Sequence, residues 1–317
     1  MTGADPRTAT PVVGILVLNY HQPDSTLACI RSLLAREGSE TRILWIENDA
    51  RSSKGSVEAL LASHGIPCRK VAAEDSALPD AGQIGLLEVP ENLGYAGGNN
   101  LGLALLARHH VPFAWVLNND TLLLEGSSRD LVERARERPE VGLWGTAIST
   151  GKRMIFGGRL VSPTFHTEVL TDPFQLQDAL TFINGCSMFM GVAEATAVGG
   201  IPPHYFLYYE DVAFSLLLRR KGRKLASLPG VVVAHEESLS SGLRSAVVEY
   251  YNRRNRWFFI QEFFPEHLHS NRRRLAYQIQ KYLFRFRFRR AWLEWLAYRD
   301  FKARSHGRSL RDLQGPT

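Results

Sequence analysis

The chain has 317 residues, of which 44% are hydrophobic and 22% charged, a composition that excludes wholesale disorder and suits one large α/β domain with an appendage. It contains no apolar N-terminal segment, no apolar run of bilayer length and only three cysteines without C-x-x-C spacing, so we expect a cytoplasmic protein with reduced thiols. The net charge of +6 is concentrated in residues 271–317, which hold 13 Lys and Arg against three acids, and this excess favours an anionic partner.

The first half of the chain alternates predicted strands with predicted helices. Apolar, β-branched runs predict strands at residues 11–18, 41–46, 84–89 and 113–117. Helical spacing predicts a helix capped by Asp24 or Ser25, a helix at 57–63, and a helix at 101–107 after a glycine-rich loop at 91–100. This alternation indicates βαβ units and a mainly parallel sheet, in which ligands bind at the carboxyl ends of the strands.

The second half is less regular. We predict short strands at residues 141–148, 153–156 and 159–161, a helix at 211–221, and a strand at 231–234 that ends beside His235. From about residue 245 the sequence is helical, aromatic and basic.

Asn118, Asn119 and Asp120 follow the strand at 113–117, where a carboxylate can hold Mg²⁺ or Mn²⁺ together with substrate phosphates. His235, at another strand end, is a candidate second ligand because imidazole suits Mn²⁺. The alternatives are that Asp120 caps the following turn and that His235 is an ordinary loop histidine.

Glu210 and Asp211 follow an aromatic strip at the start of the predicted helix at 211–221. The positive end of the helix dipole favours the ionised form of Asp211, as a general base requires. The alternative is a pair of acids that only compensates the helix dipole.

The glycine-rich loop resembles a phosphate cradle because its glycines lead into a helix start. It matches neither the dinucleotide-binding nor the P-loop pattern, and an ordinary turn between strand and helix is the alternative.

Taken in chain order, these polar and glycine-rich stretches resemble the motifs of family 2 glycosyltransferases, in particular of the bacterial rhamnosyltransferase-like branch. The matching stretches are residues 13–20, 43–48, 92–102, 115–121, 184–185, 206–222 and 235–242. The resemblance implies a GT-A fold, Rossmann-like and mainly parallel, at residues 11–245, with a nucleotide-binding half at 11–125 and an acceptor-binding half at 126–245. A helical, basic-aromatic extension occupies residues 246–317.

The resemblance also implies roles for individual residues. Those that bind the nucleotide sugar are Leu18, Asn19, Glu47, Asn92, Gly94, Asn99, Asn118 and Asn119. Asn184 and Gly185 are implied to bind the acceptor, Asp120 and His235 the metal, and Asp211 to act as the base beside Glu210. Three positions depart from the family pattern: Glu47 replaces an Asp, Asn118 replaces the first Asp of D-x-D, and Ala213 replaces a second acid.

The implied reaction is an inverting, in-line transfer of a sugar, rhamnose in that branch, from a dTDP- or UDP-sugar to a glycan or polyprenyl-linked hydroxyl. Such a reaction belongs to the synthesis of cell-surface polysaccharide. Mg²⁺ or Mn²⁺ neutralises the diphosphate leaving group.

The basic tail suggests a helix with two apolar stripes from about residue 275. One stripe contains Leu275, Ile279, Tyr282, Phe286, Leu293 and Leu296, and the other contains Phe284, Phe288, Trp292, Trp295 and Tyr298. The second stripe, flanked by arginines, fits either the anionic inner face of the cell membrane or a homodimer interface. No motif for specific nucleic-acid binding is present.

Two other functions remain open from the sequence. A sugar-nucleotide nucleotidyltransferase shares the α/β plan, but it needs a basic glycine-rich loop after the first strand, where this chain has Asn19, Tyr20, His21 and Gln22. A non-catalytic sugar-nucleotide or membrane-surface binding module is the other alternative, and the presence of both Asp120 and Asp211 argues against it.

Overall fold

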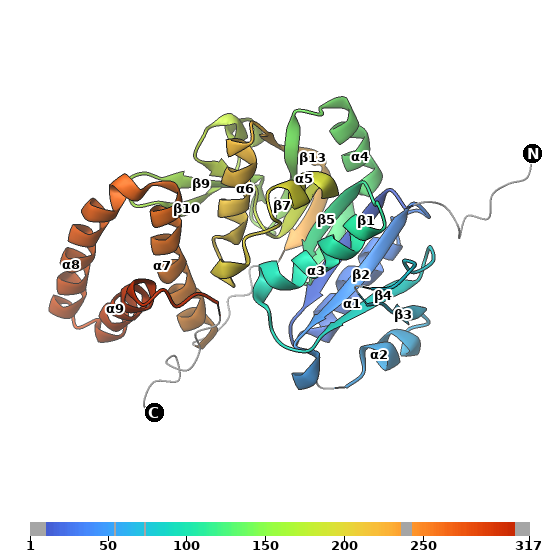
Figure 1. The fold of residues 1–317 in the computed structure, drawn as a ribbon, viewed down its shortest axis with the longest axis horizontal. Helices are drawn as coiled ribbons and strands as arrows, with labels where there is room; N and C mark the ends of the chain where they lie inside the picture. The colour runs from blue at the N-terminus through green and yellow to red at the C-terminus, as the bar shows by residue number, and fades with distance from the viewer. Residues whose placement is uncertain (1–10, 54, 73, 236–242, 308–317) are drawn as a thin grey trace, which may run out of the picture.

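The structure is a computed structural model that describes residues 11–53, 55–72, 74–235 and 243–307. Its main feature is a large mixed sheet, with α7–α9 gathered at one end of the molecule (Figure 1). The strands are β1 (Val13–Asn19), β2 (Thr41–Asn48), β3 (Cys68–Lys70), β4 (Ile84–Val89), β5 (Phe113–Asn118), β6 (Thr121–Glu125), β7 (Val141–Ser149), β8 (Met154–Ile155), β9 (Gly157–Val161), β10 (His166–Leu170), β11 (Thr181–Phe182), β12 (Ser187–Gly191) and β13 (Lys224–His235). The helices are α1 (Pro23–Leu34), α2 (Val57–Ser63), α3 (Gly94–Arg108), α4 (Ser128–Glu137), α5 (Val192–Ala197), α6 (Glu210–Arg220), α7 (Leu243–Phe263), α8 (Leu268–Phe284) and α9 (Phe288–Lys302).

The large sheet has the strand order β3-β4-β2-β1-β5-β12-β7-β13-β6, with β8 paired to β7. The strands from β3 to β5 are parallel, whereas β12 is antiparallel to both β5 and β7. β9, β10 and β11 form a separate small sheet. The prediction of an α/β fold with a mainly parallel sheet is therefore confirmed.

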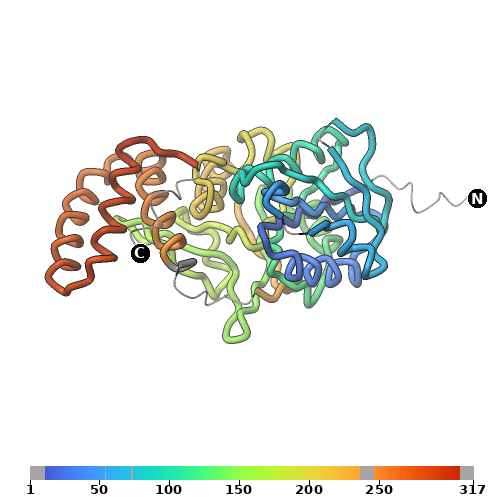
Figure 2. The backbone as a smooth tube through the Cα atoms, turned by 90° about the horizontal axis from the view of Figure 1, so that it is seen from below, coloured from blue at the N-terminus to red at the C-terminus, as the bar shows by residue number. Residues whose placement is uncertain are grey.

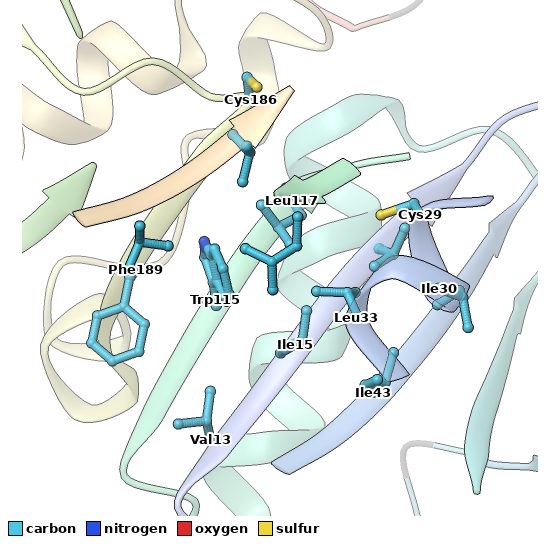
Figure 3. Close-up of a cluster of buried hydrophobic side chains, with 14 of the residues drawn as sticks. Val13, Ile15, Cys29, Ile30, Leu33, Ile43, Trp115, Leu117, Cys186 and Phe189 are labelled. Carbon is cyan, nitrogen blue, oxygen red and sulfur yellow. The ribbon is translucent and has the colours of Figure 1, made fainter. Parts of the chain in front are cut away.

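The central strands are buried on both faces, which explains their nearly continuous apolar sequence. One face of the sheet packs against α1, where Ile30 and Leu33 meet Ile15 and Trp115, each fully buried (Figure 3). The other face packs against α3. These two layers fix the strand ends, where the polar clusters lie.

Helix α3 begins at Gly94, seven residues before the predicted start. The predicted glycine-rich loop is therefore mostly helix. Gly98 and Gly102 explain the difference, because a Cβ added at Gly98 would lie 2.3 Å from a methyl of Leu18, and one at Gly102 would lie 2.8 Å from a methyl of Leu16. These glycines let the helix backbone approach the sheet, so they mark close packing rather than a turn.

Other elements also depart from the prediction. β6, α4 and β10 were not predicted, and β13 begins at Lys224 rather than at residue 231. The cap predicted at residue 24 or 25 is wrong, because α1 begins at Pro23, a residue favoured in the first turn of a helix. The three cysteines are free, as expected.

The tail is helical, as predicted, but the one helix predicted from about residue 275 is divided between α8 and α9. The chain turns between α8 and α9 at Phe286, which has a φ of 54°. The turn divides the predicted stripes, because Leu293 and Leu296 are buried while Phe286 is 80% exposed. Figures 1 and 2 both show these helices beside one another at one end of the molecule.

The tail helices share a core with the rest of the chain. Trp257, Phe258 and Phe259 of α7 pack with Tyr209 and Val212. Every helix among the described residues is too short or too polar to cross a bilayer.

Candidate functional site

A network of buried polar side chains joins the carboxyl ends of β1, β2 and β5. The Asn19 amide nitrogen donates to Glu47 Oε2 at 2.7 Å, and Thr26 Oγ1 donates to Asn19 Oδ1 at 2.8 Å. The Asn119 amide donates to Thr26 Oγ1 at 3.0 Å. Three of the predicted donor-binding residues, Asn19, Glu47 and Asn119, are thus brought together across three strands.

A cavity of about 760 Å³ opens beside this network. Glu47 lines it together with His21, Asp24 and Ser53. Glu47 Oε2 accepts hydrogen bonds from Asn19 and from Trp45 Nε1, the latter at 2.8 Å, and Oε1 accepts one from Ser53. The fixed carboxylate therefore presents its remaining acceptor capacity at a cavity large enough for a nucleoside.

Asp120 and His235 lie together, 115 residues apart in sequence. Asp120 Oδ1 is 3.2 Å from His235 Nε2, because β6, which follows Asp120, pairs with β13 and sets Thr121 opposite His235. The side chains are 31% and 23% exposed, so the pair is open to solvent on one side.

This pair fits a divalent cation in part. Asp120 Oδ1 is a buried carboxylate oxygen without a conventional hydrogen-bond partner, and an imidazole nitrogen faces it. Within the described ranges, no third His, Cys, Asp or Glu joins them. Two protein ligands suit a cation that keeps its remaining positions for water and substrate phosphates. Residues 236–242, which belong to one of the matching stretches, lie outside the described residues.

The start of α3 is held by protein groups rather than left open. Asn48 Oδ1 accepts from the backbone N–H of Leu93 at 3.0 Å, and Asn92 Oδ1 accepts from that of Gly94 at 2.8 Å. The Tyr95 N–H donates to the carbonyl of Phe206 at 2.9 Å. These three amides are therefore not available to a phosphate, and the cradle interpretation is wrong for them. Gly94 is required here because its φ is 76° and a Cβ would meet the Phe206 oxygen at 2.4 Å.

Leu18, Asn99 and Asn118, three further residues predicted to bind the donor, lie near this helix start. Leu18 packs against α3 at Gly98. Asn99 is fully buried, and its amide donates to the Tyr95 carbonyl at 2.9 Å. The carbonyl of Asn118 accepts from Thr121 Oγ1 at 2.7 Å, so this threonine and not Asp120 closes the turn.

A turn at residues 184–186 joins the two predicted parts of the site. The carbonyl of Cys186 accepts from the Asn118 N–H at 3.0 Å, and the Gly185 N–H donates to Asp211 Oδ2 at 2.8 Å. The Tyr95 hydroxyl donates to the Gly185 carbonyl. The turn therefore connects the end of β5 to Asp211 and to the start of α3.

Asp211 and Glu210 differ in their hydrogen bonding. Asp211 accepts from two backbone N–H groups, those of Gly185 and Val212, each at 2.8 Å. Glu210 is buried, and its Oε2 has no partner among the described residues. The two adjacent carboxyl groups therefore lie in unequal environments.

Burial dominates the proton affinity of both groups. Desolvation raises the pKa of Asp211 above its usual value, although the bonds from Gly185 and Val212 oppose the shift. Desolvation, and then the charge of Asp211, raise the pKa of Glu210 well above its usual value. The backbone N–H of Val212, at the helix start, favours ionised Asp211 as predicted, but desolvation outweighs it and the net shift of the pKa is upward. Glu210, without a hydrogen bond to its Oε2, has the more strongly raised pKa, so Asp211 is the more readily ionised carboxyl group of the pair.

Asp211 lines a small cavity of about 160 Å³ with Asn184, Tyr208 and Asn252. It lies between α6, α7 and the small sheet, in the half predicted to bind the acceptor. The structure thus brings Asn184, Gly185 and Asp211 together.

The backbone before Glu210 is strained. Phe206, Tyr208 and Tyr209 all have positive φ, at 67°, 68° and 73°, although none is glycine. The amide of Asn255, from α7, holds this segment by donating to the carbonyls of Tyr205, Leu207 and Tyr208 at 2.7–2.8 Å. Strain of this kind persists only where surrounding contacts fix it, and it is concentrated at functional sites.

Three further residues of the site were not predicted from the sequence. Thr26 completes the strand-end network, Tyr95 anchors the turn at Gly185, and Asn255 holds the strained segment. Only Asn255 had a signal in the sequence, since it belongs to the polar segment 252–256 between the aromatic residues of this helix. In the structure its side chain is fully buried.

No protein-family model and no curated protein matches the chain. Among solved structures, the mannosyltransferase PcManGT from Pyrobaculum calidifontis, in complex with GDP-Man and Mn²⁺, is similar with a TM-score of 0.55 at 12% identity, covering 94% of this chain and 88% of that one. S. aureus TarS gives a TM-score of 0.48 at 11% identity, covering 85% of this chain and 43% of that one. The similarity to PcManGT extends over nearly the whole chain, and the fold is the expected GT-A glycosyltransferase fold with added C-terminal helices.

Proposed function

We propose that this protein is a glycosyltransferase that moves a sugar from a nucleotide diphosphate to a hydroxyl group, with Asp211 as the base. The observation that carries the proposal is one hydrogen-bonded turn, residues 184–186, which connects the end of β5 before Asp120 to Asp211. A donor site on one side of this turn and an acceptor base on the other are what a direct transfer needs.

The donor site is assigned to the cavity at Glu47 and the strand ends beside it. Asn19, Asn118 and Asn119 lie at those ends with Leu18, and Asn92, Gly94 and Asn99 belong to the adjacent start of α3. PcManGT was solved with GDP-Man, which supports a nucleotide sugar as the donor class. The resemblance in sequence favours a dTDP- or UDP-sugar, with rhamnose as the candidate sugar.

Asp120 and His235 would hold Mg²⁺ or Mn²⁺. Bound there, the cation would neutralise the negative charge of the departing diphosphate. The Mn²⁺ in the PcManGT complex supports a divalent metal.

The acceptor hydroxyl would lie against Asp211, in the cavity lined by Asn184. An oxygen of Asp211 removes the hydroxyl proton as the acceptor oxygen attacks the anomeric carbon. The bond between this carbon and the diphosphate breaks on the opposite face, and the nucleotide diphosphate leaves. One displacement inverts the anomeric configuration and needs no covalent glycosyl-enzyme. The Gly185 N–H fixes the orientation of the carboxylate, and neutral Glu210 leaves Asp211 as the single charge at this position.

The experiment that tests this function is a panel of UDP-, dTDP- and GDP-sugars with Mg²⁺ or Mn²⁺. One donor should raise the melting temperature only with metal, because a ligand that binds only the folded state stabilises it. The same donor should then be hydrolysed slowly and transferred rapidly to a suitable sugar hydroxyl. Stabilisation without hydrolysis or transfer would support a non-catalytic binding module, and synthesis of the nucleotide sugar would support a nucleotidyltransferase.

We further propose that the turn between α8 and α9 docks on an anionic membrane at the inner face of the cell membrane, where cell-surface polysaccharide is assembled on a polyprenyl-linked acceptor. Phe284 and Phe286 are 88% and 80% exposed. Exposed arginines alternate with the aromatic side chains here, at positions 285, 287, 289 and 290. Basic charge of this kind contributes about 1 kcal/mol per residue at an anionic lipid surface.

Sedimentation with vesicles, with and without anionic lipid, tests this surface. Phe286→Ser should reduce binding to anionic vesicles, whereas Phe174→Ser, a change at an equally exposed phenylalanine on another face, should not. A concentration-dependent dimer that is lost in Phe286→Ser, without vesicle binding by the wild type, would instead support a homodimer interface.

A further inference from the structure

We infer that a second cavity, between the small sheet and α7–α9, is a subsite for an anionic group of the acceptor, either phosphate or carboxylate. The cavity has a volume of about 610 Å³. This inference rests on the proposed function, because it names the chemical class of the molecule that receives the sugar.

The cavity continues from the place where Asp211 lies. Thr167, Tyr209 and Asn252 line both this cavity and the smaller one beside Asp211. An acceptor whose hydroxyl reaches Asp211 therefore has an adjoining space for the next part of the molecule. With a volume of about 610 Å³, that space can hold another sugar or a diphosphate.

Positive charge dominates the wall of this second cavity. Arg253, Arg256 and Arg274 line it, against the single acid Glu294. Glu294 is already paired, because its Oε1 lies 3.0 Å from Arg253 Nε. The remaining two arginines leave a net positive lining for an incoming ligand to meet.

Arg256 is the central group of the proposed subsite. Its side chain is half-buried, and the described part of the chain gives it no ion pair. A guanidinium in such a place retains hydrogen-bond donors and loses part of its hydration. An oxyanion restores both interactions, and the planar fork of arginine matches phosphate or carboxylate in a bidentate manner.

Other polar groups in the lining of this cavity can also donate hydrogen bonds to an anion. Arg274 lies at the exposed rim on α8, and Asn252 and Gln278 supply side-chain amides. Trp257, also in the wall, has a buried indole N–H without an acceptor among the described residues. Its uncompensated dipole adds to the positive potential of the cavity. A neutral glycan would leave this potential without a counter-charge.

Two kinds of acceptor carry the required group. One is a lipid diphosphate with the first sugars attached, and the other is a glycan that contains an acidic sugar. Both place an oxyanion beside the hydroxyl that is glycosylated, so they share the chemistry that Arg256 would recognise.

Indole NMR of the full chain, labelled with ¹⁵N in tryptophan, gives a direct test. The chain has six tryptophans, and the spectrum of Trp257→Phe identifies the Trp257 signal. Titration with inorganic pyrophosphate, in EDTA to prevent binding through a metal, should shift this signal in a saturable manner. In Arg256→Gln the affinity should fall at least about tenfold, the range expected for loss of one charged hydrogen-bonding partner.

Arg272→Gln is the matched control, because Arg272 is exposed on α8 and does not line the cavity. It should bind pyrophosphate like the wild type. Should Arg256→Gln fail to fold, Arg274→Gln at the exposed rim tests the same charge and should weaken binding. The inference is overturned if the wild type shows no saturable shift. It is also overturned if both cavity variants bind pyrophosphate with the affinity of the wild type.

Further titrations separate the two sources. Farnesyl diphosphate compared with farnesol reports on a lipid diphosphate, and glucuronate compared with glucose reports on an acidic sugar. Tighter binding of either anion than of its neutral partner supports the inference, and equal binding within both pairs overturns it.

Donor hydrolysis without acceptor is measured in parallel. Its absence in the wild type contradicts the proposed glycosyl transfer, whereas the Trp257 signal reports on the subsite alone.

Discussion

Asp211 Oδ2 and the backbone N–H of Gly185 form a hydrogen bond of 2.8 Å, although the two residues belong to different elements. The bond fixes one oxygen of the carboxylate, and the Val212 N–H fixes the other. An Asp held at both oxygens keeps one orientation toward the adjoining cavity. The geometry of the proposed base therefore depends on the turn at residues 184–186.

Gly185→Ala should displace this carboxylate. A Cβ at position 185 would lie 3.3 Å from both Asp211 Cβ and Asp211 Oδ2, so one of the two must move by a few tenths of an ångström. We expect sugar transfer to slow by roughly tenfold, since small misplacements of reacting groups are costly. Steady-state kinetics with saturating donor measures the effect. Donor hydrolysis without acceptor should change little, and an equal loss in both reactions would contradict a local effect on the base.

Asp211→Asn should reduce transfer by roughly 10²–10⁴-fold, the range for loss of a general base, while donor affinity stays within about twofold. Glu210→Gln is the matched change at the adjacent carboxyl group. Since Glu210 is already neutral in the proposed mechanism, this variant should keep most of the activity. Comparison of kcat and of donor binding in the two variants distinguishes their roles, and a larger loss in Glu210→Gln would reverse the assignment.

Glu210 also predicts how stability depends on pH. Its pKa in the folded state is raised well above the usual glutamate value, whereas the unfolded chain titrates near ~4.3. Above that pH the folded state binds more protons than the unfolded state, so the free energy of unfolding falls as the pH rises toward the folded-state pKa. Urea denaturation at a series of pH values rising from about 4.3, the unfolded-state pKa, should show a smaller decline in Glu210→Gln. Parallel curves for the two proteins would contradict the assignment.

Asp120→Ala should weaken metal binding and, with it, binding of the nucleotide diphosphate. His235→Ala should do the same to a smaller extent, because a neutral ligand contributes less charge. We expect a loss of roughly tenfold or more in apparent donor affinity for Asp120→Ala in the presence of Mn²⁺. Calorimetric titration of the donor with and without metal measures this. Equal donor affinity in wild type and Asp120→Ala, with metal present, argues against the site.

Asn255→Ala removes the amide that donates to the carbonyls of Tyr205, Leu207 and Tyr208. The Tyr205 carbonyl keeps the Leu207 N–H and Arg254 as donors, so we expect the free energy of unfolding to fall by roughly 1–3 kcal/mol in total, the cost of weakening a buried hydrogen-bond network. The strained backbone before Asp211 should relax, and kcat should fall more than donor affinity. Ser270→Ala, an exposed change on α8, is the control for both readouts. Unchanged kcat in a destabilised variant would limit Asn255 to a structural role.

The α/β architecture was predictable because its signals are local. The runs that form β1, β2, β4 and β5 are apolar and β-branched, and α2 was predicted at its observed bounds. The start of α3 was not predictable in the same way. Its glycines suggested a turn. In the structure Gly98 and Gly102 belong to the helix, and glycine is needed there because Leu18 and Leu16 of the sheet approach the helix backbone closely.

Part of the candidate site was also predictable from the sequence. Asp120 and His235 were paired by their positions at strand ends, and the structure brings them within 3.2 Å. The net upward shift in the pKa of Asp211 was not predicted, because the helix start is visible in a sequence whereas the desolvation that outweighs its effect is not. The contacts of Tyr95 join distant segments of the chain, so no local pattern in the sequence indicates them.

The start of α3 lies in the part of the chain proposed to bind the nucleotide, but Tyr95 bonds to the backbone of both Phe206 and Gly185 in the part proposed to bind the acceptor. Recombination of these two parts between related chains would therefore break contacts on both sides of the proposed reaction centre. A chimaera joined near residue 125 should work only when the partners of Gly94 and Tyr95 are transferred with them. Evolution of a new acceptor preference in this scaffold is thus constrained by residues that do not line the proposed acceptor cavities.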